Sequence, residues 1–190
     1  EENWAEGWTH LDELGYFDAP APVATTDVDV TTDITADTTW TKDKAYIIKK
    51  PIYVTSGATL TIEPGTTIFG SKDGTDVGSL VITRGSKINA VGTQREPIVF
   101  TALDSRDLDL TLEDSQRWGG LVILGNAILN DSDNPIVNPG AAEPPTREVE
   151  GFPTGTDSAK ISYGGNNDDD NSGVLRFVSI RYGGFPLSED

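Results

Sequence analysis

A short pattern that recurs along the chain constrains the fold more than any other feature. Residues 60–68 and residues 80–88 both read L-x-I-x-x-G-x-x-I, so the two copies lie twenty residues apart. A third copy begins at Leu121, forty-one residues after the second, and lacks one residue before its glycine. That distance is close to two further steps of the same period. A period of about 20 to 50 residues indicates a repeat architecture in which each unit stacks on the last.

The repeat predicts an all-β solenoid, a β-helix in which each turn is built from short strands. One turn cannot bury its own Leu and Ile side chains, whereas stacked turns place equivalent side chains above one another. We therefore expect Leu60 to stack near Leu80. In the same way, Ile62 should stack near Ile82. Gly65 and Gly85 are expected to supply the positive φ that a tight corner needs. A propeller or a sandwich would need hairpins and a less regular period.

Further strand-like runs lie between and after the copies of the pattern. Each run has three to nine residues and is bounded by Gly, Pro, Asp or Asn, as expected of strands separated by turns. They cover residues 45–48, 52–54, 97–101 and 174–182. The β-helix domain is predicted to occupy residues 38–190.

Residues 1–37 are predicted to form a separate N-terminal unit, either a cap or an assembly arm. Trp4, Trp8 and Leu11 fall on one stripe of a helix predicted over residues 3–14. We expect this stripe to dock on an apolar surface, although two tryptophans on one stripe also suit a carbohydrate platform.

The rest of the N-terminal unit is predicted to be extended. Residues 18–26 are rich in Pro and Ala and predict a linker. Residues 27–37 alternate apolar and polar side chains, as an edge strand does.

Charge and composition exclude several classes of function. The chain carries 14 Lys and Arg against 31 Asp and Glu, a net charge of −17 that repels nucleic acids and anionic lipids. Cysteine is absent, which excludes disulfides, thiol catalysis and iron–sulfur clusters. The single histidine, His10, excludes a multi-histidine zinc site. No apolar run approaches the ~20 residues of a membrane-spanning helix, so membrane insertion is not expected.

The same composition predicts where the protein works. The chain is acidic, rich in Asp and Thr, free of methionine, and begins at Glu1. These features indicate the mature part of an exported bacterial protein.

Three segments carry a family resemblance: residues 58–68, residues 118–125, and residues 164–184 with their Gly-Gly-Asn-Asn-Asp-Asp-Asp start. They resemble secreted right-handed parallel β-helix proteins of bacterial surfaces, most of which have no assigned activity. The resemblance covers about residues 38–184, and its last segment is the most specific. It implies a right-handed coil and a location outside the cell.

The densest carboxylate cluster is Asp168, Asp169 and Asp170, flanked by Asn166 and Asn171. Ca²⁺ takes about six to eight oxygen ligands, and adjacent carboxylates favour a neutralising cation. These five residues are therefore candidate calcium ligands. They match neither the EF-hand loop nor the glycine-rich calcium nonapeptide, so a solvated acidic loop is an equal alternative.

Two further acidic runs lie between predicted strands, Asp104, Asp107 and Asp109 in one and Asp131 and Asp133 in the other. If loops of successive turns emerge on one side, these acids could share calcium ions. Solubilising loops are the favoured interpretation.

Enzymatic activity is not expected, although lyases that cleave pectin use this fold. A calcium-assisted lyase needs a basic residue that removes the sugar C5 proton. Arg84, Arg176 and Arg181 lie in or beside predicted strands, but no lyase motif surrounds them and a shared fold does not confer activity. No nucleophile elbow or phosphate-binding loop occurs in the chain.

The sequence thus predicts a structural protein of the bacterial cell surface that self-associates or joins a larger assembly. The contacts would be the N-terminal arm and an open C-terminal turn, whose unpaired strand edges invite another copy. The alternative is a carbohydrate-binding or polysaccharide-degrading module. That alternative needs exposed aromatic rings, and the candidates are Tyr46, Tyr53, Trp118 and Tyr182.

Overall fold

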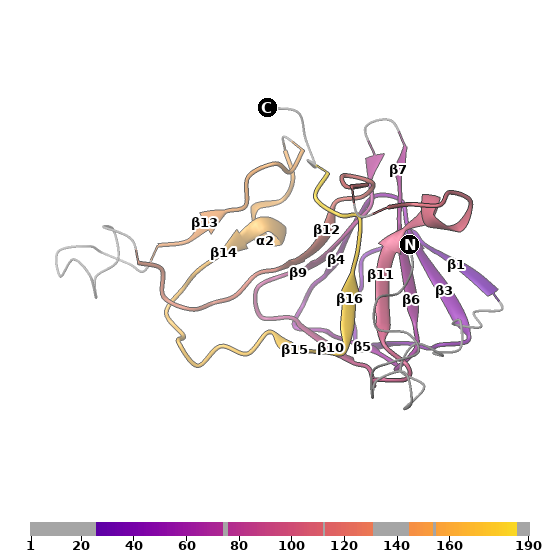
Figure 1. The fold of residues 1–190 in the computed structure, drawn as a ribbon. Coiled ribbons are helices and arrows are strands. Elements are labelled where there is room, and N and C mark those ends of the chain that lie inside the picture. The colour runs from indigo at the N-terminus through magenta and orange to yellow at the C-terminus, as the bar shows by residue number, and fades with distance from the viewer. Residues whose placement is uncertain (1–25, 74–75, 112, 131–144, 154, 186–190) are drawn as a thin grey trace.

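Three parallel β-sheets enclose one elongated core in the computed structural model of the chain (Figure 1). The structure describes residues 26–73, 76–111, 113–130, 145–153 and 155–185. The chain visits the three sheets in a repeating order, so that successive turns stack along one axis. The fold is an all-β parallel β-helix, as the repeat predicts.

The three sheets are named A, B and C. Sheet A contains, in spatial order, β1 (Thr26–Val30), β3 (Lys44–Ile48), β6 (Thr67–Gly70), β11 (Ile98–Ala102) and β16 (Val178–Ile180). Sheet B contains β4 (Pro51–Val54), β9 (Ser79–Ile82) and β12 (Gly120–Ile123). Sheet C contains β2 (Thr38–Trp40), β5 (Thr59–Ile62), β10 (Lys87–Val91) and β15 (Gly173–Arg176).

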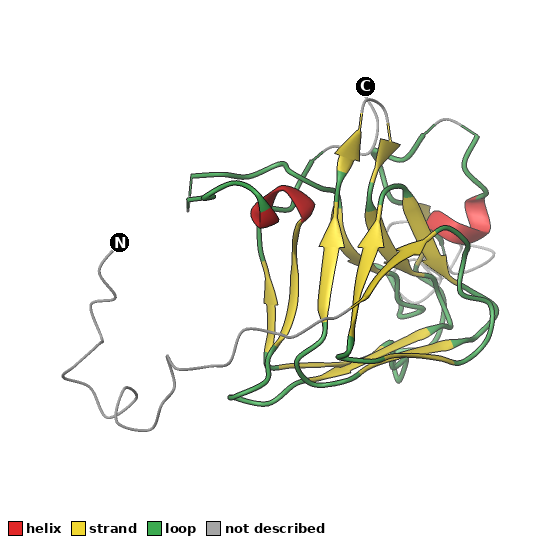
Figure 2. Cartoon of the chain, turned by 90° about the vertical axis from the view of Figure 1, so that its right-hand side faces the viewer, coloured by secondary structure: helices red, strands yellow, loops and turns green. Residues whose placement is uncertain are grey.

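The remaining elements are short and lie outside the three sheets (Figure 2). They are the antiparallel pairs of β7 (Lys72–Asp73) with β8 (Asp76–Val77) and β13 (Arg147–Glu148) with β14 (Ser162–Tyr163), the helix α2 (Ser158–Ile161) and a 3₁₀ helix over Leu103–Arg106. No helix in the described part of the chain has the length and apolar character that crossing a bilayer requires.

The stacking predicted from the twenty-residue spacing is wrong in detail. Leu60 lies in sheet C, where it pairs in register with Ile88. Leu80 lies in sheet B, between Ile52 and Leu121. Leu60 therefore does not stack on Leu80, and the same shift of sheet separates Ile62 from Ile82. The third copy stacks directly on the second, one turn further along instead of two.

The pattern marks corners of the coil, and more than one corner of each turn carries it. Residues 60–68 show it between β5 and β6, and residues 52–60 show a variant of it, I-x-V-x-x-G-x-x-L, between β4 and β5. One step between neighbouring strands is thus eight residues, whereas the turn from Ile52 to Leu80 is twenty-eight. The twenty-residue spacing between the first two copies is therefore one full turn of twenty-eight residues minus one step of eight residues. The spacing therefore relates two different corners, not two equivalent positions.

The glycines of the first two copies have the conformation that the corners were expected to need, whereas Gly125 of the third copy does not have a positive φ. Gly57, Gly65 and Gly85 have φ values of 74°, 81° and 83°. An L-residue with a side chain pays a steric penalty in this left-handed region, and glycine does not. The repeated glycine is therefore explained by the corner geometry.

Trp118 packs in the core beside Phe100 and Gly70. It is fully buried, and its ring lies parallel to that of Phe100 at a centroid distance of 6.5 Å. Its Nε1 donates a hydrogen bond to the backbone oxygen of Arg181 at 2.7 Å. The inward position facing it on β6 is Gly70, where a Cβ atom would overlap the indole ring. The small residue thus makes room for the largest side chain of the core.

Residues 26–37 form the first turn of the coil. β1 is the edge of sheet A and pairs with β3, but it covers only the start of the edge strand predicted over residues 27–37. Ile34 makes an isolated parallel bridge with Val54 of sheet B. The predicted helix over residues 3–14 lies outside the described residues, as does the linker predicted over residues 18–26 except for Thr26, which begins β1.

The last described turn consists of two strands where the sequence suggests one. Residues 174–182 divide into β15 and β16 at Phe177, which has a positive φ of 49° and turns the chain from sheet C into sheet A. Leu175 of β15 and Ile180 of β16 are exposed.

Between β12 and β15 the chain leaves the coil. We call residues 145–153 and 155–163 of this excursion the lateral segment. It lies against the outer face of sheet B (Figure 1), where Phe152 and Ile161 bury Tyr53 and Val81 in a second apolar cluster. Lys160 donates to Asp33 at 2.7 Å and ties α2 to the first turn.

Candidate binding groove on sheet A

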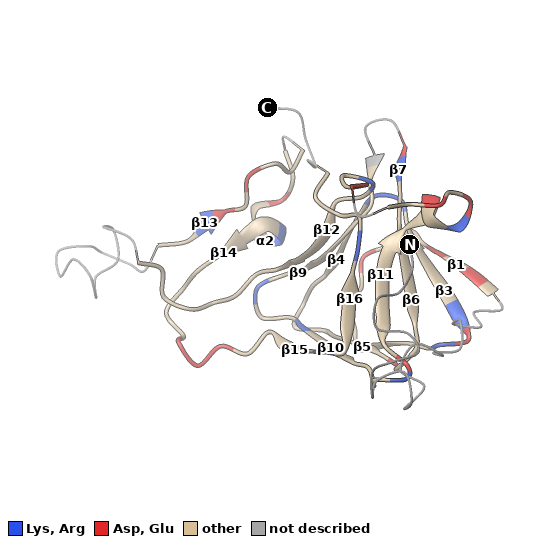
Figure 3. Cartoon of the chain, viewed as in Figure 1, with Lys and Arg blue, Asp and Glu red and all other residues tan. Residues whose placement is uncertain are grey.

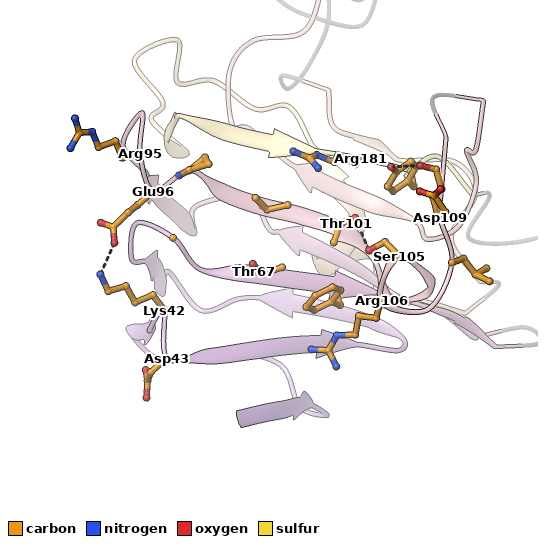
Figure 4. A pocket seen from close by; sticks show the side chains of 17 residues that line it. Lys42, Asp43, Thr67, Arg95, Glu96, Thr101, Ser105, Arg106, Asp109 and Arg181 are labelled. Atoms are coloured by element: carbon orange, nitrogen blue, oxygen red, sulfur yellow. Dashed lines mark hydrogen bonds and ion pairs between the residues drawn. The ribbon is translucent and has the colours of Figure 1, made fainter. Parts of the chain in front are cut away.

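The outer face of sheet A forms the floor of a groove of about 780 Å³ (Figure 4). Alternation along the strands turns Ile68 and Phe100 into the core, so their neighbours point outward. The outward residues of β6 and β11 that line the groove are Thr67, Phe69, Val99 and Thr101. The floor is therefore partly apolar and partly hydroxylic.

Two walls stand at opposite ends of the strands of sheet A. One wall consists of the corners that precede β3 and β11, where Lys42 donates to Glu96 at 2.7 Å beside Arg95. The other follows β11 and contains the 3₁₀ helix with Ser105 and Arg106, then residues 108–110. Because the walls flank the strand ends, the groove lies across β6 and β11, with Arg181 and Tyr182 at the side where β16 ends (Figure 4).

Arg106 fastens the second wall to the sheet. Its two terminal nitrogens donate to the carboxylate of Asp27 on β1 at 2.7 and 2.8 Å. Its guanidinium lies 4.1 Å from the centre of the Phe69 ring, a cation–π contact. The hydrogen bond from Arg106 holds the pKa of Asp27 below its usual value, and the same bond raises the pKa of Arg106.

The floor contains a hydroxyl group with an unmet hydrogen bond. Thr67 is 5% exposed, and its Oγ1 is buried without a partner among the described residues. By contrast, the hydroxyl groups of Thr101 and Ser105 lie 3.3 Å apart, and Ser105 donates to the backbone oxygen of Ala102 at 2.6 Å. A buried polar group without a partner is uncommon and indicates a missing ligand or water.

The groove has a different charge balance from the rest of the chain. It is lined by four cations (Lys42, Arg95, Arg106 and Arg181) and three anions (Asp43, Glu96 and Asp109), although the whole chain has a net charge of −17. Within the described residues, neither Arg95 nor Arg181 makes an ion pair. Two guanidinium groups are therefore available to an anionic ligand.

The acidic run before β15 forms hydrogen bonds with the neighbouring backbone. Asp168 Oδ1 accepts from the backbone NH of Ile128 at 3.0 Å. Asp170 Oδ2 accepts from the NH of Asn126 at 3.0 Å and from Ser172 Oγ at 3.3 Å. These carboxylates therefore hold the segment that follows β12.

The remaining candidate calcium ligands of this run are Asn171, Asn166 and Asp169. The side chain of Asn171 accepts from the NH of Gly173 at 2.8 Å and shapes the entry into β15. Asn166 and Asp169 are exposed.

The acidic runs do not converge. Asp104 lies 3.6 Å from Arg117, Asp107 is exposed, and Asp109 lines the groove. This run and the one before β15 lie on opposite sides of the molecule (Figure 3). Asp131 and Asp133 lie outside the described residues, and in the described part no three acidic or histidine side chains gather as a metal-binding group. Calcium binding stays a prediction.

The four aromatic rings predicted to form a carbohydrate platform do not gather on one exposed face, and of the four only Tyr182 lines the groove. Tyr46 points into the core and stacks on Trp40 at 4.5 Å. Tyr53 points outward but is covered by the lateral segment, and Trp118 is fully buried. Tyr182 is half-buried against the core, and its hydroxyl donates to the backbone oxygen of Leu110 at 3.3 Å.

Most residues of the groove were missed by sequence reasoning. Of the three arginines singled out, only Arg181 lines it, whereas Arg84 donates to the backbone oxygen of Gly164 at 2.7 Å. The available signal was the alternation in β6 and β11, where apolar inward residues alternate with Thr67 and Thr101. Trp4, Trp8 and Leu11 of the predicted arm lie outside the described residues.

Residues 32–190 match the family model described as a pectate-lyase-like beta helix domain. No curated protein and no solved structure matches the chain.

Proposed function

We propose that this chain, which belongs to the family of pectate-lyase-like β-helix domains, binds an extended anionic polysaccharide in the groove of sheet A without cleaving it. The observation that carries the proposal is the groove itself. It lies across two adjacent strands, β6 and β11, and has cations on both sides of a partly apolar floor. The function is proposed for the outside of the cell, where the composition predicts the protein to work.

The chemistry of the lining supports an acidic sugar chain as the ligand. The guanidinium groups of Arg95 and Arg181 make no ion pair among the described residues, although Arg181 Nε donates to Ser179 Oγ at 2.9 Å, and they suit carboxylates, which arginine binds through paired hydrogen bonds. The apolar floor around Phe69 and Val99 suits the faces of sugar rings, and the unpartnered Thr67 hydroxyl offers a hydrogen bond.

The lining also supports binding without catalysis. A lyase needs a base that removes the C5 proton of the sugar. Arg106 is the best-held basic group in the groove, but its bond with Asp27 raises its pKa and makes it a poorer base. The groove would therefore bind the sugar chain and leave it intact.

Calorimetric titration with oligogalacturonate tests the proposal, with a neutral galactan oligomer of equal length as the comparison. The acidic oligomer should bind more tightly, and added salt should weaken binding because exposed charges are screened. Arg95→Glu should lower affinity about tenfold or more, equivalent to about 1.4 kcal/mol.

The matched control is Lys87→Glu, which makes the same change of charge at an exposed site on sheet C. It should leave affinity unchanged. Equal binding of both oligomers, or an equal loss in both variants, would contradict the proposed site. Appearance of shortened, unsaturated products would contradict the absence of catalysis.

A further inference from the structure

Arg106 differs from the other cations of the groove in the position of its partner. Lys42 pairs with Glu96, which itself lines the groove. The other two cations make no ion pair among the described residues. Arg106 pairs instead with Asp27 of β1, a strand that contributes no residue to the groove lining. One cation of the groove is therefore held by a carboxylate that lies outside it.

The guanidinium group of Arg106 lies above the groove floor. It is 4.1 Å from the centre of the Phe69 ring, which belongs to β6 and lines the groove. Asp27 belongs to the same outward column as Thr67, two strands away, so these two residues lie about 10 Å apart along the coil axis. In Figure 4 the Arg106 side chain extends toward the side of sheet A opposite Arg181. The pair with Asp27 thus draws the guanidinium group toward one side of the groove.

The contact with Asp27 uses the edge of the guanidinium group that recognises carboxylates. The two terminal nitrogens of Arg106 donate to the two carboxylate oxygens of Asp27 at 2.7 and 2.8 Å. Arginine binds a carboxylate of any origin through paired hydrogen bonds of this kind. Asp27 therefore occupies the donors that a carboxylate of a ligand would need.

The exposure of the pair allows one carboxylate to replace another. The side chains of Arg106 and Asp27 are 32% and 55% exposed. A carboxylate with this exposure regains contact with water when its ion pair breaks, so it is not left as a buried, unpaired charge. Exposed ion pairs also contribute little free energy. A ligand that the rest of the groove already holds can therefore take the place of Asp27.

We propose that Asp27 is a built-in competitor of acidic ligands, whose carboxylate occupies Arg106 in the ligand-free protein and is replaced there by a carboxylate of the bound sugar chain. Asp27 is thus a positioning residue. It acts through Arg106, lowers the affinity for acidic ligands and does not itself contact them. This inference rests on the proposed function of the groove.

Calorimetric titration of Asp27→Asn with oligogalacturonate tests the proposal. Asparagine keeps the shape of the side chain and one acceptor oxygen but removes the charge. Affinity should rise about two- to fivefold, the range that an exposed ion pair contributes. Affinity for the neutral galactan oligomer, which carries no carboxylate, should not change. Asp27→Glu restores the charge and should bind the acidic oligomer as the wild type does.

The matched control is Asp29→Asn. Asp29 lies two residues further along β1 and therefore on the same face, is 52% exposed, and pairs with Lys49. Neither residue of this second pair lines the groove. Asp29→Asn removes the same charge from the same strand. At physiological ionic strength, where charges are screened over about 8 Å, it should leave affinity unchanged.

A double substitution tests whether Asp27 acts through Arg106. Arg106→Gln alone should lower affinity for the acidic oligomer, because it removes a cation from the groove lining. Asp27→Asn added to Arg106→Gln should give no gain, since the competitor then has nothing to occupy.

Two results would overturn the proposal. Asp27→Asn could bind the acidic oligomer no more tightly than Asp29→Asn does, which would mean that the ion pair stays intact in the complex. A gain that persists in the Arg106→Gln background would mean that the charge of Asp27 acts directly on the ligand.

Both results are distinct from a failure of the proposed function. The proposed function stands where the wild type binds the acidic oligomer and Arg95→Glu weakens that binding. An absence of binding by the wild type and by Asp27→Asn would overturn the proposed function together with this inference.

Discussion

Sheets A and B belong to the same coil, but the outer face of sheet B is covered by protein and the outer face of sheet A is open. The outward residues Tyr53 and Val81 of sheet B are apolar, and Phe152 and Ile161 of the lateral segment bury them. The outward face of sheet A mixes Thr67 and other hydroxyl side chains with apolar ones, and it stays open as the floor of a groove.

The difference shows what an outer face needs. A contiguous apolar face is stabilised by removal from water, about 25 cal/mol for each Å² buried, so the chain returns to cover it. A face that mixes hydroxyl, apolar and cationic groups is stable in water. It therefore remains available to a ligand.

The largest loss of stability is expected from a change that weakens the packing of the lateral segment on sheet B. Phe152→Ala should lower the free energy of unfolding by about 3–5 kcal/mol, because it opens a cavity in the second apolar cluster. Phe69→Ala, on the half-buried floor of sheet A, should cost only about 1 kcal/mol. Denaturant titration of both variants measures the difference, and equal losses would show that the two faces contribute alike.

A smaller loss of stability is expected when the hydrogen bond between Asp170 and the segment that follows β12 is removed. Asp170→Ala leaves the NH of Asn126 without its acceptor and should cost about 1–3 kcal/mol. The exposed neighbour Asp169 provides the control, and Asp169→Ala should have little effect. The loss should be the same with millimolar calcium and with excess chelator. A loss seen only with calcium present would instead assign Asp170 to a metal site.

The smallest effect on stability is expected from the ion pair between Arg106 and Asp27 in the groove wall, and this effect depends on pH. The hydrogen bond from Arg106 lowers the pKa of Asp27 in the folded protein, so its stabilisation is present above the unfolded value of about 4. It is lost as the pH falls through the folded value. Arg106→Gln should therefore melt below the wild type at pH 7, and the gap should narrow in strong acid. A gap that is constant with pH would show that the ion pair contributes nothing.

Sequence reasoning recovered the coil but not its register. The pattern with glycine appears wherever two strands meet at a tight corner, so residues 52–60, 60–68 and 80–88 carry the same signal. Local sequence cannot show which of these corners lie above one another. Turn length varies as well, from eighteen residues between Val28 and Tyr46 to eighty between Phe100 and Ile180.

The groove was harder to predict from the sequence than the fold was. Lys42, Arg106 and Arg181 lie far apart in the chain, and each is an ordinary surface cation by its neighbours in sequence. The acidic cluster attracted attention because its members are consecutive, but Asp168 and Asp170 bind backbone NH groups. Consecutive residues are easy to notice, whereas a groove collects one or two residues from each turn.

The sequence by itself determined the class of fold, the positions of most strands and the excess of negative charge, because strand alternation and corner glycines are local properties. The tertiary structure alone decided which strands pair, which outer face is covered and which cations share a groove. The physical reason is that stacking and burial depend on residues distant in sequence, and the chain brings those together only when the coil closes around its core.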